Sequence, residues 1–366
     1  MTHRPRSCVG LPRRARCPRH PSRALQTLGR YTQATGWPVG PEADVPLALG
    51  IPMQAGVFAQ KVVVAAPGQV SRGAQAVLRG VVAPVVRLCF RPTLEGWEHL
   101  PTEGPFLLVA NHSAGVGAAE IMSIATLWME RFGTSRPLAG FALPLGFVVW
   151  PTSAMHRAIG TIPSTYPAAY AALGQGVPIL VFPGGDHESL KPVWHNHRVD
   201  FTGRVGFLRI ALAKGVPIVP LGIRNGAWTA PILLRSRLLS TLLVLPRLMG
   251  VKRWGLSLLG VAVAALMAVA LPVGPAVKAL AIWLWLGSPL VFLPVVPATL
   301  RLRIGPPLSM KELFPEGSGG AVDGDVGEGS GAGATDEALA TAGARVERTL
   351  EALIRGESSA DVGATR

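Results

Sequence analysis

Short apolar runs that alternate with helical patterns constrain the fold of this chain more than any other feature. Residues 106–109, 177–182 and 216–223 form three such runs, and none of them contains a charged side chain. Uncharged runs of this length, bounded by Gly and Pro, are typical of buried strands. Helical patterns at residues 121–131 and 205–213 lie between them. This alternation predicts an α/β layered domain.

We expect further segments around this core. Residues 74–90 have the pattern of an amphipathic helix, which Pro84 could interrupt. Residues 300–304 alternate with period two, which predicts a strand that returns to the edge of the sheet. The expected segments are a basic tail at residues 1–52, the core at 74–228, a hydrophobic membrane-associated segment at 229–300, the returning edge strand at 301–314, a flexible Gly/Ser/Asp-rich linker at 316–334 and a C-terminal helix at 335–355.

The composition indicates contact with a membrane. Apolar residues make up 49% of the 366 residues, charged residues only 15%, and the mean hydropathy is +0.37. Residues 254–277 and 279–300 are uncharged, and about 20 such residues can cross a hydrocarbon core. We therefore expect a C-terminal hydrophobic insertion, either a membrane hairpin or a re-entrant segment, whose basic flanks lie on the cytoplasmic side. Prolines within both runs leave open that they form shorter, membrane-dipping or buried pieces.

The N-terminal region is strongly basic. The whole chain has a formal net charge of +14, and residues 1–30 hold eight arginines and no acidic residue. Such an arm could be attracted to anionic lipid, could bind nucleic acid, or could be sequence translated upstream of the true start. It has no aromatic residue for base stacking, so we expect no nucleic-acid partner. Cys8, Cys17 and Cys89 are too scattered for a disulfide framework.

A histidine follows the first apolar run. His112 comes directly after the predicted strand at residues 106–109 and precedes a stretch of small residues that ends at Glu120. An imidazole at a strand end, beside backbone that a substrate can approach closely, is suited to general-base catalysis. No GxSxG motif is present, which argues against a serine hydrolase.

Four blocks of sequence resemble the phospholipid/glycerol acyltransferase superfamily, and most of all its lysophospholipid and monoacylglycerol acyltransferase-like branch. They are residues 101–112, 158–164 (AIGTIPS), 181–188 (VFPGGDHE) and 200–223. Any one block is a weak signal, but four in order with sensible spacing are a specific one. The resemblance extends over residues 78–308.

The resemblance implies that His112 is the catalytic base. In the family, this histidine deprotonates an acceptor hydroxyl, which attacks an acyl thioester, and a carboxylate orients the imidazole. That carboxylate usually stands five residues after the histidine, where this chain has Gly117. The sequence is similar to a longer-spaced variant with the acid at Glu120, and Asp186 or Glu188 could approach His112 instead.

The same resemblance implies a set of substrate-binding residues: Asn111, Ser113, Gly115, Phe182, Pro183, Gly184, Gly185 and Asp186. Backbone N–H groups of residues 113–117 could meet the oxyanion. Glycerol-phosphate acyltransferases of the superfamily carry a glutamate and an arginine in the third block, where this chain has Gly184 and His187. The phosphate clamp is therefore missing from its usual place. Either the acceptor lacks a phosphomonoester, or another basic residue substitutes, the candidates being Arg157, Lys191, Arg198 and Arg204.

Metal-ligand residue types gather near the third block, at Asp186, His187, His195 and His197. They lack a fixed zinc spacing, so we expect no metal. The predicted chemistry needs no cofactor, with acyl-CoA or an acyl carrier protein as co-substrate.

Together these observations predict a membrane-associated acyltransferase on the cytoplasmic face of the cell membrane. It would move a fatty acyl group from an acyl thioester to a hydroxyl of a lysophospholipid or related glycerolipid. Two alternatives remain open. One is a non-catalytic membrane protein whose site has degraded at Gly117, Gly184 and His187, and the other is a nucleic-acid binder that uses the arginine-rich arm.

Overall fold

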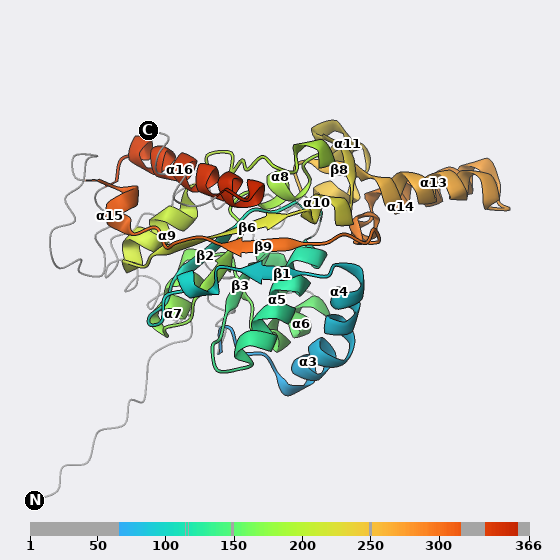
Figure 1. Ribbon diagram of the computed structural model, residues 1–366. Coiled ribbons are helices and arrows are strands. Elements are labelled where there is room, and N and C mark those ends of the chain that lie inside the picture. Colours follow the sequence, from blue (N-terminus) through green and yellow to red (C-terminus); the bar gives the residue numbers. More distant parts are fainter. Residues whose placement is uncertain are drawn as a thin grey trace, which may run out of the picture. The chain divides into compact units, whose positions relative to one another are not determined.

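A mostly parallel sheet of seven strands organises the structure, a computed structural model that describes residues 66–113, 115, 117–147, 150–248, 251–315 and 334–357 (Figure 1). The strand order is β1-β9-β6-β2-β5-β3-β4, and every neighbouring pair is parallel except β6 and β9. The strands are β1 (Thr93–Glu95), β2 (Leu107–Ala110), β3 (Ala139–Ala142), β4 (Ile162–Pro163), β5 (Ile179–Val181), β6 (Ile218–Arg224) and β9 (Arg301–Ile304).

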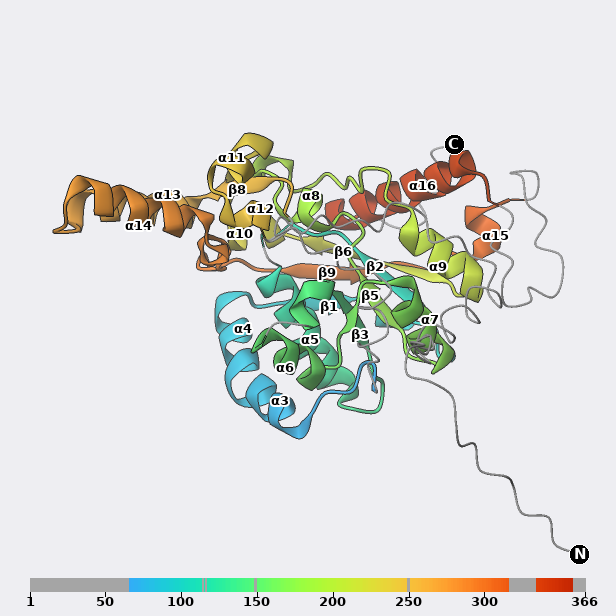
Figure 2. The ribbon, with the colours of Figure 1, turned by 180° about the vertical axis from the view of Figure 1, so that it is seen from behind.

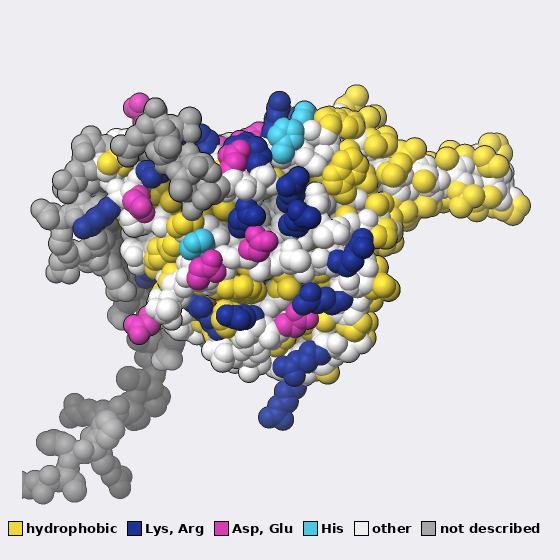
Figure 3. Space-filling view, viewed as in Figure 1, with side chains coloured by type: hydrophobic (Ala, Val, Ile, Leu, Met, Phe, Trp, Pro, Cys, Tyr) yellow, Lys and Arg dark blue, Asp and Glu magenta, His cyan; other side chains and the backbone are white. Residues whose placement is uncertain are grey.

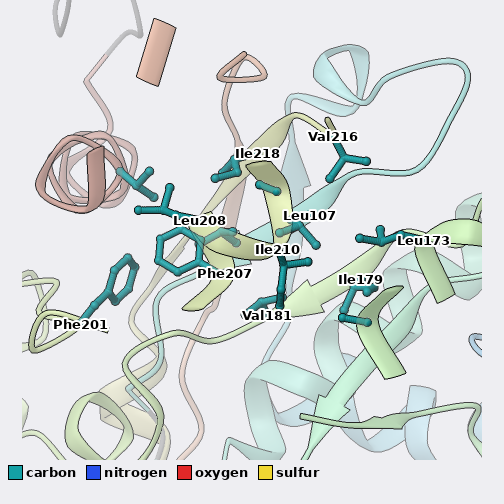
Figure 4. Packing of buried hydrophobic residues seen from close by; sticks show 14 of the residues in the cluster. Leu107, Leu173, Ile179, Val181, Phe201, Phe207, Leu208, Ile210, Val216 and Ile218 are labelled. Atoms are coloured by element: carbon teal, nitrogen blue, oxygen red, sulfur yellow. The ribbon is translucent and has the colours of Figure 1, made fainter. Parts of the chain in front are cut away.

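Helices cover both faces of this sheet, as expected for an α/β layered fold. On β2, Leu107 and Val109 pack toward α7 (Tyr166–Gly174), α9 (Gly206–Lys214) and α16 (Asp336–Arg355), and Figure 4 shows side chains of this cluster. Leu108 and Ala110 pack toward α4 (Ala83–Cys89) and α5 (Ala118–Phe132) on the opposite face. Burial on both faces explains why the strand is a continuous apolar run rather than an alternating one.

The position of β9 differs from the sequence-based expectation. Residues 301–304 form a strand, but it lies between β6 and β1 and not at the edge of the sheet. Thr93, Leu94 and Glu95 of β1 pair with Arg301, Leu302 and Arg303 and take the edge position themselves. β1 is only three residues long, too short for its apolar pattern to stand out in the sequence.

The hydrophobic segment of the chain folds into several short elements. β7 (Ile232–Ser236) and β8 (Trp254–Ser257) pair as a separate two-stranded sheet, with α11 (Arg237–Leu242) and α12 (Leu245–Leu248) between them in sequence. α13 (Leu258–Ala270) and α14 (Pro275–Gly287) then form a helical hairpin, seen from behind in Figure 2. The first uncharged run thus starts as a strand and breaks at the Pro272–Gly274 turn. Among the described residues, no helix is both long and apolar enough to cross a membrane.

The first described helices form the expected N-terminal amphipathic element. α3 (Arg72–Val77) continues through a π-helical turn at Leu78–Val82 into α4. Pro84 stands in the first turn of α4, directly after the π-helical turn, and does not end the helix, because a π-turn can absorb the altered hydrogen bonding.

The remaining helices are short. They are α6 (Thr152–Ala158), α8 (Gly185–Ser189), α10 (Gly226–Thr229) and α15 (Met310–Leu313). The predicted tail at residues 1–52 lies outside the described residues, as does nearly all of the predicted linker. Thr335 caps α16, because its side chain accepts a hydrogen bond from the N–H of Ala338.

Candidate active site

Three parallel strands end on the carboxyl-terminal side of the sheet and bring blocks of sequence that are far apart in the chain together. β2 leads into His112, β5 leads into Phe182, and β6 leads into Gly226. β2 pairs in parallel with both β5 and β6, so their carboxyl ends meet. The carboxyl ends of the strands are where open α/β sheets usually hold ligands.

His112 and Glu120 are in hydrogen-bond contact at the carboxyl ends of these strands. Nδ1 of His112 lies 2.6 Å from Oε2 of Glu120. The Glu120 side chain is fully buried, whereas the His112 side chain keeps 11% of its surface exposed. Oε1 of Glu120 accepts hydrogen bonds from the hydroxyl and the N–H of Ser113. With Nδ1–H donated to the carboxylate, Nε2 carries the lone pair that could accept a proton.

Two glycines leave the room that this pair needs. Gly117 has φ 72°, and a β-carbon there would lie 2.1 Å from Cε1 of His112. A β-carbon on Gly226 would lie 2.1 Å from Oε1 of Glu120. Glu120 stands in the first turn of α5, one turn beyond Gly117, and from there its carboxylate reaches back to the imidazole. The unusual spacing of eight residues is therefore compatible with a close His–Glu contact.

A second buried carboxylate holds the backbone of His112. Oε2 of Glu188 accepts the His112 N–H at 3.1 Å, and Oε1 accepts a hydrogen bond from Nζ of Lys191 at 3.1 Å. Nζ of Lys191 also donates to the carbonyl of Arg198. Burial raises the pKa of Glu188 to about 7, although Lys191 and the His112 N–H both act to lower it. Sequence reasoning considered Glu188 only as a partner for the imidazole, and its contact with the main chain left no signal in the sequence.

Three expected substrate-binding residues have structural partners instead. Both amide atoms of the fully buried Asn111 side chain bond to the backbone of Ile223, which ties the end of β2 to β6. The Ser113 N–H bonds to Glu120, and the Gly115 N–H bonds to the carbonyl of Ser189. These two N–H groups are therefore not available to an oxyanion. Residues 114 and 116 of the same loop lie outside the described residues.

The third block forms one wall of a cavity of about 590 Å³. The Phe182 ring packs on the His112 imidazole, with centroids 4.6 Å apart, and also lines this cavity. Asp186 forms an ion pair with Arg204 at 2.7 Å and so is not the partner of His112. Arg204 also donates to the carbonyl of Gly184. The lining is mainly apolar and includes Phe141, Leu143, Val181, Pro183, Phe207, Ile210 and Val251, with Gly185, Asp186, Arg204 and Lys252 among its other members.

The proposed substitutes for the phosphate clamp are largely engaged elsewhere. Lys191 is buried against Glu188, and Arg204 is paired with Asp186. Arg157 contacts the hydroxyl of Ser153. Arg198 does not line the cavity, whose basic lining residues are Arg204 and Lys252.

Two arginines from the hydrophobic segment surround His187. Arg253 contacts Nδ1 of His187 at 2.6 Å, Arg235 donates to its carbonyl, and Nε2 lies 2.9 Å from Asp200. Burial, followed by the charge of Arg235, lowers the pKa of His187. Across the described part of the chain, no three His, Cys, Asp or Glu side chains come together as a metal site. Sequence reasoning treated Arg253 only as a flanking charge, did not consider Arg235, and missed this cluster.

Comparison with known proteins identifies the domain that contains His112, Glu120 and Glu188. The model of the family "Acyltransferase" matches residues 91–224. These residues form an acyltransferase-family domain. The match includes three of the central strands, β2, β5 and β6, together with His112, Glu120 and Glu188, but not Gly226, Arg235 or Arg253.

Curated relatives are similar to part of this chain at low identity. An uncharacterized protein of Mycobacterium tuberculosis is 29% identical over 170 residues, which is 45% of this chain and 47% of the relative. One from Mycobacterium leprae is 28% identical over 171 residues, or 47% of this chain and 46% of the relative. The chloroplastic phytyl ester synthase 2 of Arabidopsis thaliana is 29% identical over 133 residues, or 34% of this chain and 18% of that protein. The chain thus spans about half the length of the mycobacterial relatives and less of the plant enzyme.

A solved structure is also similar to this chain. It is the 1-acyl-sn-glycerophosphate (LPA) acyltransferase PlsC from Thermotoga maritima, at 18% sequence identity and a TM-score of 0.40. The match covers 78% of this chain and 83% of that chain.

Proposed function

We propose that this protein transfers a fatty acyl group from an acyl thioester to a hydroxyl of a lysophospholipid or related glycerolipid. The observation that carries the proposal is the 2.6 Å contact between His112 and the buried Glu120, within an acyltransferase-family domain. A buried carboxylate on Nδ1 fixes the tautomer and stabilises the imidazolium that forms when Nε2 takes up a proton. The pair thus has the arrangement that base catalysis on a hydroxyl requires.

In the proposed reaction, Nε2 of His112 removes the proton of the acceptor hydroxyl as its oxygen attacks the thioester carbonyl carbon. The resulting tetrahedral intermediate collapses with cleavage of the C–S bond. The proton then passes from the imidazolium to the departing thiolate, so that ester and free thiol are the products. Neither a covalent enzyme intermediate nor a metal is needed, and acyl-CoA or an acyl carrier protein serves as the co-substrate.

The cavity beside Phe182 supports the choice of lipid substrates. Its mainly apolar wall suits an acyl chain, and Phe182 lies between this wall and the His112 imidazole. Of its two basic lining residues, Arg204, the one beside the third block, is already paired with Asp186, which disfavours an acceptor that presents a phosphomonoester at that block.

A turnover assay tests the proposal directly. The purified full chain would be incubated with labelled acyl-CoA and a panel of lysophospholipids, monoacylglycerols and long-chain alcohols, while thiol release and labelled ester are both measured. Acceptor-dependent ester formation is expected, and His112→Ala should reduce it by about 10²–10⁴-fold, the usual range for a general base. Equal thiol release by the wild type and His112→Ala would refute the proposal.

A further inference from the structure

The helices α13 and α14 pack on little besides each other. Each has 13 residues, and within these two fully described helices only Gly260 and Gly287, both at the base, are buried. We call residues 258–287 the arm. Figure 3 shows it covered almost entirely by apolar side chains. Its exposed large residues are Leu258, Val261, Leu266, Val269, Val273, Val277, Leu280 and Leu284, and Val269 is 87% exposed.

Apolar exposure on both helices and at their turn does not resemble a surface for one protein partner. A helix that docks in a groove presents a single apolar stripe and keeps its opposite face polar. The only charged residue of the arm is Lys278, and its Nζ donates to the carbonyl of Ala268 at 2.7 Å. Ala268 belongs to the last turn of α13, whose carbonyls have no partner within the helix. This satisfaction of a backbone acceptor is what a hydrocarbon environment demands.

The base of the arm has the composition of a membrane–water interface. The indole N–H groups of Trp254, Trp283 and Trp285 donate to backbone carbonyls there. Tryptophans concentrate at the headgroup level of membrane proteins. Residues 229–300 contain six basic residues and no acidic residue. Of these, Arg237, Arg247 and Lys252 are exposed beside the base, where anionic headgroups would attract them.

The length of the arm fixes how far it could reach. Thirteen helical residues span about 20 Å, at about 1.5 Å per residue. A whole hydrocarbon core is about 30 Å thick, and one leaflet is about half of that. We propose that the arm anchors this protein in a single leaflet of a bilayer that contains anionic lipids, without crossing it.

A second surface and the cavity fit the same orientation. Val77, Val81, Val85 and Leu88 are exposed along α3, the π-helical turn and α4. The segment that leaves the arm runs beside the end of α4, where the Ala298 N–H bonds to the carbonyl of Cys89. Val251 and Lys252, at the base of the arm, also line the cavity beside Phe182. An inserted arm would therefore hold this wall of the cavity at the headgroup level, within reach of lipid in the same leaflet.

Vesicle flotation tests the anchor independently of acyl transfer. The full chain would be mixed with vesicles of phosphatidylcholine, with and without phosphatidylglycerol. Strong binding is expected with phosphatidylglycerol, and the double variant Leu266→Asp/Val269→Asp should lose at least about tenfold, because each charge near the bilayer centre opposes insertion. The matched variant Leu266→Ala/Val269→Ala keeps an apolar tip and should stay bound. Unchanged binding of the Asp variant would overturn the proposal.

Labelling of the tip separates one leaflet from a full crossing. In a chain with Cys8, Cys17 and Cys89 replaced by Ser, Val269→Cys should be shielded from external maleimide once vesicles are bound. A maleimide sealed inside the vesicles should not reach it either, and labelling from the inside would refute the single-leaflet anchor. His112→Ala should bind vesicles like the wild type. A failure of the acyl-transfer proposal would therefore leave this result unaffected.

Discussion

The backbone of Gly117 lies against the imidazole of His112, so closely that a β-carbon at position 117 would be 2.1 Å from Cε1. Gly184 has the same relation to Glu188, because a β-carbon there would lie 2.6 Å from Oε2. At each of the two positions where the acyltransferase pattern has a carboxylate, this chain therefore has a glycine. A buried carboxylate stands three residues after Gly117, at Glu120 in the first turn of α5, and another stands four residues after Gly184, at Glu188 in the short helix α8. At both positions the glycine leaves room for a side chain of the site, His112 in one case and Glu188 in the other.

Gly117→Ala should reduce acyl transfer by about 10²-fold or more. The added methyl group would force the imidazole away from Glu120, and a misplacement of about 1 Å can cost about 10²-fold in rate. The left-handed backbone at 117 would add about 1–2 kcal/mol of strain. Turnover and thermal unfolding would be measured on the same preparation.

Gly215→Ala is the matched control for this variant. Gly215 also has a left-handed backbone, with φ 62°, but a β-carbon there meets nothing within 4 Å. It should show a similar strain and normal turnover. If both alanine variants lose activity equally, contact with His112 is not the reason for Gly117.

Glu120→Gln should lower turnover by about 10²–10⁴-fold, because an amide cannot stabilise the imidazolium. The turnover of Glu120→Asp should lie between those of the wild type and Glu120→Gln, because the shorter side chain lengthens the 2.6 Å contact with Nδ1 of His112. The exposed Glu130 of the same helix pairs with Arg87, and Glu130→Gln should retain full activity. Full activity of Glu120→Gln would mean that another group orients His112.

The central part of the fold could be predicted because burial leaves a local signal. β2, β5 and β6 are buried on both faces, so their sequences are continuous apolar runs between turn residues. The pairing of β9 between β1 and β6 left no such signal, since period-two alternation does not show which strand lies on each side. The strand β8 was hidden inside a long uncharged run, where apolar residues fit strand and helix equally.

The candidate site was predictable to the extent that its contacts join side chains of recognisable type. The family resemblance suggested a contact between His112 and Glu120, and the structure places Nδ1 and Oε2 of this pair 2.6 Å apart. Asn111 and Glu188 bond to backbone atoms of Ile223 and His112. Every residue has such atoms, so the residue types in the sequence could not indicate these contacts. Arg235 and Arg253 reach His187 only through the pairing of β7 with β8.

Asn111→Ala should destabilise the protein by about 2–6 kcal/mol. The Asn111 side chain is the partner of both the N–H and the C=O of Ile223, and its loss would leave these buried groups unpaired at about 1–3 kcal/mol each. Chemical denaturation of the variant would measure the change. The half-buried Asn225 makes one bond, to Thr299, and Asn225→Ala should cost less. An equal loss of unfolding free energy in the two variants would show that the two bonds from Asn111 to Ile223 do not stabilise the protein more than the single bond of Asn225.

Glu188 should make stability fall as the pH rises from about 4.5 to about 7. Its pKa is raised to about 7 from an ordinary value of 4.5, so in this window the folded protein keeps a proton that the unfolded chain releases. The stability that Glu188 contributes is therefore fully present below its pKa in the unfolded chain and is lost as the pH rises through its pKa in the folded protein. The unfolding free energy of the wild type, relative to Glu188→Gln, should decrease by up to about 3 kcal/mol across the window. Urea unfolding at several pH values gives this difference. Glu95 forms an exposed ion pair with Arg303, and the unfolding free energy of Glu95→Gln should change with pH as that of the wild type does. A Glu188→Gln curve parallel to the wild type as well would contradict a raised pKa for Glu188.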